Sequence, residues 1–371
     1  MPLPDRLRLA REFVGLTQVE VSQRAGIGES SLSEFESGKR EPSLTQLEAL
    51  ARTYHRSWTW FMESTPVETG PLVLWRQRPA SGSPAIETRF LELCRSFRRL
   101  EVLEREPAAP PLPGATGRAS DWNYRMASEL ARTVRGTLAL GDRPAPALLG
   151  VLEEVWKVKV FHLDFEPEGT AASHSSEDIG AAILLNRHSV RWRRNHDLAH
   201  ELFHLITWNV FHGDAGARDD AAWEQEEKLA TNFAAALLMP EEAFRAAVDE
   251  RTHDGRIGPE ALHDVARSFD VSIESAIWRL HFTYGRRPEE GAATRDLIEK
   301  AKALTPSLTF RQDSPPPEFP ARFEALAWRA LRAGRLSVAT FARTMNLSRA
   351  QVLRLLDQKG WNGEEIPIPA P

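Results

Sequence analysis

The chain has 371 residues, which is too long for one ordinary domain and predicts two to three. Hydrophobic content of 42% and charged content of 27% are normal for a globular protein, and a formal net charge of -5 excludes a chain that binds nucleic acid over its whole surface. A single cysteine, Cys94, excludes a disulfide framework and a zinc site built from cysteines.

The first residues, Met-Pro-Leu-Pro-Asp-Arg, soon carry charge, and no apolar run approaches the roughly 20 residues that span a bilayer. We therefore expect no signal peptide, no membrane partner and a cytoplasmic location. Residues 1–63 are predicted to form a compact set of short helices. The segment 64–82 is rich in proline, glycine and serine and is predicted to be a linker, in which Leu72-Val73-Leu74-Trp75 can still pack. Amphipathic helices are expected over 86–105 and 121–140.

From residue 148 the pattern changes to strands mixed with helices. A short helix over Leu148 to Trp156 precedes three predicted strands, at Val158–Leu163, Gly169–Ser175 and Gly180–Asn186. Long helices are expected over 191–207 and 222–238, the second ended by Pro240, and two shorter helices within 259–284. The expected fold is therefore mainly α with a small β-sheet (α+β).

A second proline-rich break, Pro315 to Pro320, separates a C-terminal helical piece over 321–357, and the last ten residues are expected to be frayed. These breaks divide the chain into four predicted parts: a helical head at 1–63, a linker and helix at 64–120, an α+β middle at 121–290 and a helical C-terminal region at 291–371.

The segment His200-Glu201-Leu202-Phe203-His204 carries the strongest chemical signal. Two histidines four apart on a helix lie on one face, where both imidazoles can chelate one metal ion. Glu201 can then take a proton from water activated by zinc and hand it to a leaving amine. The flanking residues are apolar nearly all round, so this helix is predicted to be buried. Unpaired polar side chains are costly to bury, so two histidines and a glutamate on such a helix indicate a function. The alternative is a pair of surface histidines.

A catalytic zinc takes a third protein ligand, for which the acidic cluster Glu224, Glu226 and Glu227 is the candidate source. Glu227 shares a helix face with Ala230 and Ala234, whose small side chains allow another helix to approach closely. Acidic residues also favour a helix N-terminus, which accounts for Glu224 and Glu226 and leaves Glu227 open between the two roles.

A strand ending in Ile-Leu-Leu-Asn, then Leu-Ala-His-Glu-x-x-His, then Glu-x-x-Ala-x-x-Phe-Ala-x-x-Leu-Leu-Met-Pro together resemble the ImmA/IrrE family of metallopeptidases, over roughly residues 125–285. The resemblance implies one zinc ion (Zn2+) bound by His200, His204 and Glu227, with Glu201 as general base. It also implies a protein substrate, a helix-turn-helix repressor cleaved in a stress, DNA-damage or prophage response. The strand at 180–186 would be the edge strand along which an extended peptide lies.

Two positions depart from the family pattern. Phe203 stands where glycine is common and narrows the room near the metal. His196 and Asp197 replace residues that are commonly phenylalanine and threonine, and we expect a capping or packing role for His196 rather than ligation. Four further histidines near the site in sequence are candidates to stabilise the oxyanion, with no ground for choosing among them: His162, His174, His188 and His212.

The N-terminal segment has the punctuation of a helix-turn-helix. Thr17 and Glu20 form a capping box, Gly26 closes that helix, and the next helix runs from Ser30 to Ser37. Leu-Thr-Gln, Ala-Gly-Ile and Ser-x-x-Glu-x-Gly-Lys-Arg-x-Pro-Ser-Leu resemble the XRE (Cro/cI-type) repressor domain over residues 4–63. The resemblance implies contacts in the DNA major groove from Ser30, Ser31 and Glu34, and phosphate contacts from Gln18, Lys39 and Arg40.

The charge of this segment argues against DNA binding. Acidic residues outnumber basic ones within 1–63, by nine to eight, and the recognition helix carries Glu29, Glu34 and Glu36. A carboxylate accepts only from cytosine and repels phosphates, although Glu36 is normal in the family and expected to be structural. The alternative is a helix-turn-helix reused for dimerisation, giving a homodimer, or for docking another such domain.

The C-terminal piece shows helices separated by Gly334 and by the pairs Leu336-Ser337 and Leu347-Ser348, a pattern again typical of a helix-turn-helix. Longer ImmA/IrrE proteins often end in a similar piece, which implies a sensing or substrate-docking region. A helical cap with solvated arginines fits the same pattern.

Two functional hypotheses follow. The first is a regulator with a DNA-binding head and a zinc endopeptidase middle, which cuts a repressor or itself when a signal arrives. The second is a DNA-binding transcription factor whose peptidase-like middle only senses a ligand or partner. The intact set of His200, Glu201 and His204 favours the enzyme, because a domain that only binds has no need to keep Glu201.

Overall fold

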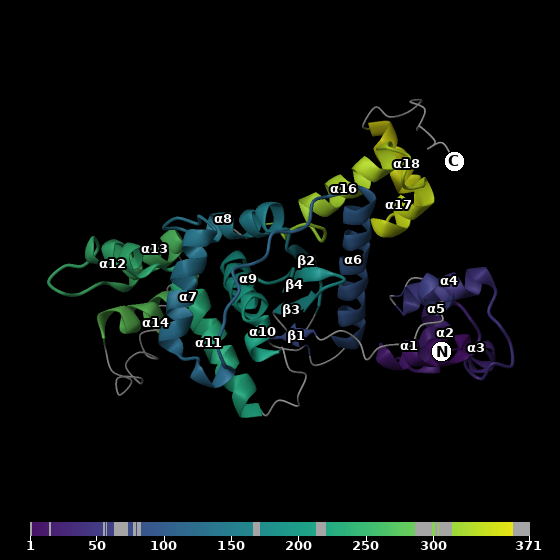
Figure 1. Ribbon diagram of the computed structural model, residues 1–371, viewed down its shortest axis with the longest axis horizontal. Helices are drawn as coiled ribbons and strands as arrows, with labels where there is room; N and C mark the ends of the chain where they lie inside the picture. Colours follow the sequence, from purple (N-terminus) through teal and green to yellow (C-terminus); the bar gives the residue numbers. More distant parts are fainter. Residues whose placement is uncertain are drawn as a thin grey trace.

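The computed structural model describes residues 2–14, 16–54, 56, 58–62, 73–76, 79, 83–165, 171–212, 220–285, 299–300, 303 and 314–358. Most of the predicted linker and the last ten residues lie outside this set. Helices dominate and surround one small sheet (Figure 1), so the expected class, mainly α with a small β-sheet, is confirmed. Across the described ranges, no helix is both long enough and apolar enough to cross a membrane.

The N-terminal head packs as short helices around a core of its own. Thr17 and Glu20 form the predicted capping box, and Gly26 ends its helix in the left-handed region at φ 67°. Apolar side chains from all the helices of the head form this core, and Ala85, just after the predicted linker, also packs against it. The helices are α1 Leu3–Phe13, α2 Gln18–Ala25, α3 Glu29–Glu36, α4 Leu44–Thr53 and α5 Trp58–Met62.

The described sheet has the strand order β1-β3-β4-β2, which is visible at the centre of Figure 1. Its strands are β1 Leu74–Trp75, β2 Lys159–Leu163, β3 Ala171–Ser176 and β4 Gly180–Asn186. β3 and β4 form an antiparallel hairpin, and β2 runs parallel to β4. All three strands expected from alternation are present, although Gly169 lies outside the described residues. The segment expected only to pack adds β1, antiparallel to the outer edge of β3.

The expectation that residues 180–186 form the edge strand is wrong. β4 lies inside the sheet, with β3 on one side and β2 on the other, so both of its edges are already paired. An extended peptide therefore cannot add to it. The alternation of side chains reports which face of a strand is buried and carries no information on which strands are its neighbours.

The two faces of the sheet pack against different helices. Ala171 and Ile183 point into a core shared with α7, α9 and α11. Ala172 and Leu184, one residue further along their strands, point into a second core shared with α6 and α16. The bounds of these helices are α6 Ser83–Leu103, α7 Tyr124–Thr137, α9 Arg191–Ile206, α11 Asp220–Leu238 and α16 Ala321–Arg332. This division places α9 directly against the hairpin of β3 and β4.

Shorter helices complete the described chain. Asp270, in the left-handed region at φ 54°, separates the two short helices expected within 259–284, α13 and α14. α12 begins straight after Pro240 and was outside the sequence-based expectations. The remaining bounds are η1 Ala119–Asp121, α8 Ala145–Gly150, η2 Val151–Val155, α10 Trp208–Phe211, α12 Glu241–Asp249, α13 Pro259–Phe269, α14 Ile273–Tyr284, α17 Val338–Thr344 and α18 Arg349–Gln358.

The C-terminal helices dock onto α6 through arginines. Arg335 pairs with Glu104 at 2.8 Å, and Arg329 pairs with the same carboxylate at 3.7 Å. Arg322 is buried and bonds Glu101 on α6. Arg322 therefore departs from the alternative of a cap with solvated arginines, whereas Arg329 and Arg335 remain exposed while they pair with Glu104, just after α6.

Candidate metal centre

The candidate site lies where α9 crosses α11. Ala230 and Ala234 on α11 are small and fully buried, which lets the two helices approach closely. His200 and His204 lie one turn apart on the buried half of α9 and face α11. Glu227 lies one turn before Ala230 on the same face of α11.

Three side chains bring their ligand atoms together. The Nε2 atoms of His200 and His204 are 3.2 Å apart. Glu227 places Oε2 3.1 Å from His200 Nε2 and Oε1 3.2 Å from His204 Nε2. Two ligand atoms on a tetrahedral zinc, each about 2.0–2.1 Å from the ion, lie about 3.3–3.4 Å from each other. The chemistry and spacing of this group therefore fit one zinc ion, with a fourth position left for a bound molecule.

The charges of the group depend on burial and on mutual contacts. Burial lowers the pKa of His200 to about 3. Burial also acts to lower the pKa of His204, but its hydrogen bonds to Glu226 and Glu227 outweigh burial and raise this pKa to about 10. Burial would raise the pKa of Glu227, yet the two histidines lower it to about 2. Glu226 and Glu227 therefore favour the protonated form of His204, and a metal that binds there competes with that proton.

Glu201 is a fully buried carboxylate, and among the described residues neither of its oxygens has a hydrogen-bond partner. Burial is the largest cause that raises its pKa to about 8, while His204 and Ser173 on β3 act to lower it. Glu201 is thus a buried carboxyl group next to the candidate metal ligands, and such a group can exchange protons with a molecule bound there.

Glu226 holds the far side of His204. Its Oε1 lies 2.8 Å from Nδ1 of His204 and 3.0 Å from Nε2 of His212. The interpretation of Glu226 as an acid that favours a helix N-terminus is wrong, because this side chain is fully buried. The two histidines lower its pKa despite burial. The sequence offered one signal for this role, the position of Glu226 next to Glu227. Helical spacing hid it, because adjacent residues on a helix point in different directions.

The other histidines near the site lie outside the group formed by His200, His204 and Glu227. The Nδ1 atom of His196 lies 3.1 Å from a guanidinium nitrogen of Arg76, and His196 is not part of the ligand group. His174 contacts Ser176 and His188 contacts Asp164. His162 is buried on β2, where burial lowers its pKa to about 4. Of the four oxyanion candidates, His212 lies beside the ligand group, through Glu226.

Phe203 points away from the ligand group into the core. Its ring packs edge-on to Trp122 with centroids 5.9 Å apart and against Phe233 at 5.5 Å. The centroid of the neighbouring His204 ring is 5.9 Å away. The large side chain at this position is thus accommodated between α9 and α11.

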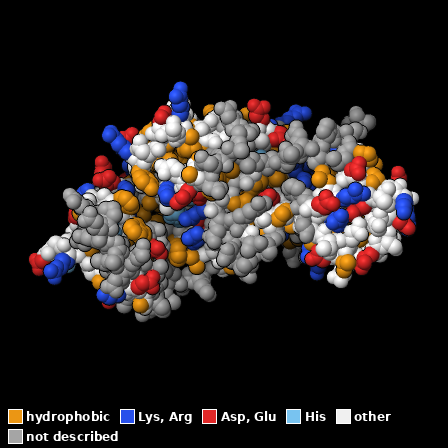
Figure 2. Space-filling view, turned by 90° about the horizontal axis from the view of Figure 1, so that it is seen from below, with side chains coloured by type: hydrophobic (Ala, Val, Ile, Leu, Met, Phe, Trp, Pro, Cys, Tyr) orange, Lys and Arg blue, Asp and Glu red, His pale blue; other side chains and the backbone are white. Residues whose placement is uncertain are grey.

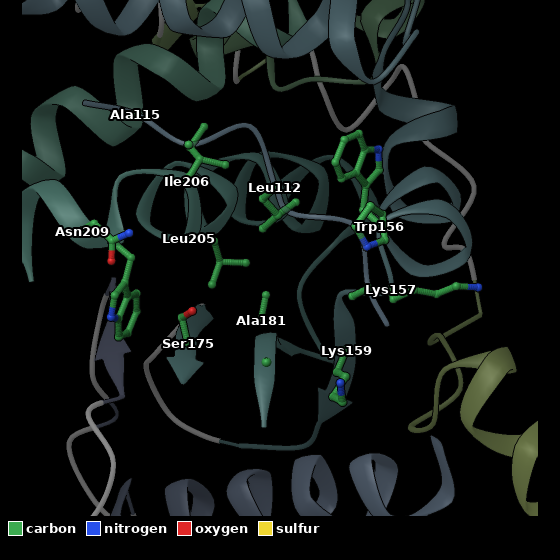
Figure 3. Close-up of a pocket in the computed structure, with 15 residues that line it drawn as sticks. Leu112, Ala115, Trp156, Lys157, Lys159, Ser175, Ala181, Leu205, Ile206 and Asn209 are labelled. Atoms are coloured by element: carbon green, nitrogen blue, oxygen red, sulfur yellow. The ribbon is translucent and has the colours of Figure 1, made fainter. Parts of the chain in front are cut away.

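A pocket of about 290 Å³ lies at the C-terminal end of α9. Figure 3 shows Leu112 and Ile206 on one side of it and Ser175 and Ala181 on the other. Trp156 and Lys159 close one end. None of the three candidate metal ligands lines this pocket, so it is a separate cavity.

The expected DNA-contacting residues lie on α2, α3 and the turn that follows. Ser30, Lys39 and Arg40 are exposed, and Ser31 is half-buried. Glu34 lies 3.9 Å from Arg40 as an ion pair. The amide nitrogen of Gln18 donates to Glu36 at 3.0 Å.

Glu36 is buried and also receives two hydrogen bonds from Arg11. This network joins α1, α2 and α3, which is the structural role expected for Glu36. Figure 2 shows acidic and basic side chains interspersed over the visible face of the head, at the right of the molecule. That face shows no single basic surface.

Comparisons with known proteins agree with this architecture. Residues 153–281 match the Peptidase M78 family, described as the IrrE N-terminal-like domain, and residues 7–61 match a helix-turn-helix family. The chain is similar to a solved structure described as a Mycobacterium tuberculosis transcriptional regulator, with 17% identity and a TM-score of 0.33 over 51% of this chain and 51% of that chain. The match thus spans about half of that protein.

A second solved structure, Bacillus thuringiensis PlcR in complex with the peptide PapR7 and DNA, matches with 12% identity and a TM-score of 0.18 over 82% of this chain and 95% of that chain. No curated protein matches the chain. From the two family matches, the chain joins an N-terminal XRE-type helix-turn-helix domain to an ImmA/IrrE-type domain of the M78 metallopeptidase family.

Proposed function

We propose that the protein is a zinc-dependent endopeptidase and transcriptional regulator, which cleaves a helix-turn-helix repressor, or itself, in a stress, DNA-damage or prophage response. The observation that carries the proposal is the convergence of His200, His204 and Glu227 beside buried Glu201. The M78 family match supports it, because that family is one of metallopeptidases.

In this proposal His200, His204 and Glu227 hold one zinc ion per chain, and Glu226 orients the ring of His204. A bound zinc would polarise the substrate carbonyl and lower the pKa of a water molecule. Glu201 accepts a proton from the attacking water and then delivers it to the leaving amine. Burial at the α9–α11 crossing keeps bulk water from competing with these contacts.

The variant Glu201→Gln tests the catalytic assignment, because it keeps the shape of the side chain and removes the base. We expect it to retain zinc and to lose cleavage of a helix-turn-helix repressor encoded beside this chain, by about 10²–10⁴-fold. Glu224→Gln is the control, since Glu224 is exposed and pairs with Lys228 on the surface. Cleavage by Glu201→Gln at the rate of the control would remove Glu201 from the mechanism.

The second candidate function is a DNA-binding regulator whose peptidase-like domain only senses a ligand. The separate pocket of about 290 Å³ favours it, because such a cavity can take a small molecule without using the metal group. The two candidates differ in one result: a sensor holds its ligand and leaves every repressor intact, with zinc bound or removed.

The proposed DNA contacts come from Ser30, Ser31 and Glu34 to bases, and from Gln18, Lys39 and Arg40 to phosphates. The exposure of Ser30, Lys39 and Arg40 supports this, while Gln18 is engaged with Glu36. We expect binding to the promoter of its own operon to weaken steeply with salt, in a gel-shift titration. Absence of any shifted DNA at low salt would favour the alternative, a head that docks another protein.

A further inference from the structure

The outer edge of β3 is covered by a short piece of the same chain, residues 73–76, termed here the internal strand. Leu74 pairs with Ser173 and Trp75 with Ala172, in antiparallel register. The backbone N–H of Arg76 donates to the carbonyl of Ala171 at 3.2 Å. Because hydrogen-bonding directions alternate along a strand, Ser173 presents its backbone to the same edge as Ala171.

This edge lies beside the candidate metal centre. Ser173, opposite Leu74, lies on the face of the sheet that packs against α9, the helix that carries His200 and Glu201. Arg76 reaches α9 one turn before His200, at His196 and Asp197. The internal strand therefore runs along the sheet edge and over α9, in the position that a peptide presented to Glu201 would take.

The side chain of Arg76 enters an acidic subsite. Its guanidinium bonds Oδ1 of Asp197 and lies 3.1 Å from Nδ1 of His196. Asp197 is fully buried, and Arg193 on the preceding turn of α9 pairs with the same Oδ1 at 3.2 Å. In the part of the chain that the structure describes, the other oxygen, Oδ2, has no hydrogen-bond partner. A buried carboxylate with one oxygen unpaired can accept a second, parallel bond from an arginine.

We propose that the outer edge of β3 together with Asp197 is a peptide-binding site for an extended segment that carries an aromatic residue followed by arginine. The internal strand is its resident occupant and must leave before a substrate enters. The proposal rests on the proposed endopeptidase function, since it names the class of segment that the site presents to Glu201.

The register defines the recognition. The residue opposite Ser173 faces α9, the next residue faces the opposite side of the sheet, and the third faces Asp197. In the internal strand that middle residue is Trp75, which is buried against Phe165 and bonds Glu87 through Nε1 at 2.7 Å. A competing segment thus needs an aromatic side chain for this position and an arginine for the next.

The internal strand is a replaceable occupant for two reasons. Its described ladder with β3 is two residues long, so few backbone hydrogen bonds hold it at the edge. Its arginine uses one oxygen of Asp197, whereas a segment free to adjust can use both. Its advantage is that it is tethered, which corresponds to an effective concentration of the order of millimolar.

The test uses the full-length chain and a fluorescent hexapeptide of its own sequence, Leu-Val-Leu-Trp-Arg-Gln, from residues 72–77. Arg76→Ala frees the subsite, and Arg193→Ala is the matched control, because it also takes one arginine from Asp197 but leaves the internal strand in place. We expect the hexapeptide to bind Arg76→Ala at least ten-fold more tightly than it binds the wild type or Arg193→Ala.

Hydrogen exchange gives a second readout that does not depend on the peptide. Amides within 171–176 should exchange faster in Arg76→Ala than in Arg193→Ala, and added hexapeptide should restore their protection. A hexapeptide with citrulline in place of arginine, which keeps the shape and loses the charge, should bind wild-type chain and Arg76→Ala at least ten-fold more weakly than the arginine peptide.

Equal binding of the hexapeptide to all three proteins, or equal binding of the arginine and citrulline peptides, would overturn the proposal. Zinc content and peptide cleavage are measured on the same samples and after EDTA treatment. Selective binding in a protein that holds no zinc counts against the endopeptidase and supports the subsite. Zinc and cleavage without selective binding count against the subsite alone.

Discussion

The Nδ1 atom of His204 is held by Glu226, and this contact decides which ring nitrogen faces His200 and Glu227. Such partners behind a ligating histidine fix its tautomer and its ring orientation. Trp223 adds to this by stacking on the His204 ring, with the planes 5° apart. At the scale of single residues, α11 therefore supplies two carboxylates to His204: Glu227 contacts Nε2 and Glu226 contacts Nδ1.

Glu226→Gln should weaken zinc binding by about 10–100-fold while the protein stays folded, because loss of the charge reduces the basicity of the ligating imidazole. The measurement is competition for zinc against a chelating dye, with the circular dichroism spectrum as the check on folding. The exposed Glu224→Gln serves as control and should match the wild type. Equal zinc affinity in all three proteins would show that Glu226 has no part in holding the metal.

At the scale of elements, η2 joins α8 to β2 and carries Glu153. Burial, and next to it the neighbouring Glu154, raises the pKa of Glu153 from its usual 4.5 to about 7. In the unfolded chain this carboxyl ionises near the usual value, so the folded state favours the protonated form. Its contribution to stability is full at pH values below 4.5 and is lost as pH rises through 7.

Glu153→Gln should therefore leave the free energy of unfolding unchanged near pH 4 and raise it by about 1 kcal/mol at pH 8, relative to the wild type. Urea unfolding at the two pH values measures the difference. Glu154→Gln is the matched control, since Glu154 is the exposed neighbour on the same turn. A gain that is the same at both pH values would contradict the assignment to Glu153.

Local sequence patterns predict the strands and helices around the site. They do not predict which of these elements lie next to each other in the fold. The spacing of His200 and His204 predicts one helix face, and Ala230 and Ala234 predict a close crossing, as found. The edge of the sheet could not be predicted, because β1 contributes two residues and pairs across a long separation in sequence. The pairing of Glu226 with His204 depends likewise on the rotation of α11 against α9.

At the scale of the whole molecule, the described apolar side chains form three cores, and α6 connects the parts that contain them. Ala85, near its start, packs against the core of the head, and Glu92 further along lies 3.9 Å from Arg56 of the head. Its middle packs on the sheet through Phe90 and Phe97, which face Phe161. The internal strand lies between α5 and α6 in sequence, so the head and the edge of β3 are joined by a short connection.

The central claim is that His200, His204 and Glu227 form one zinc site, and elemental analysis of the purified full-length chain tests it most directly. The account predicts about one zinc per wild-type chain. His204→Ala should lose the metal, and His188→Ala should keep it, because His188 is exposed and pairs with Asp164 outside the group. Full zinc occupancy in His204→Ala, or none in the wild type, would contradict the account.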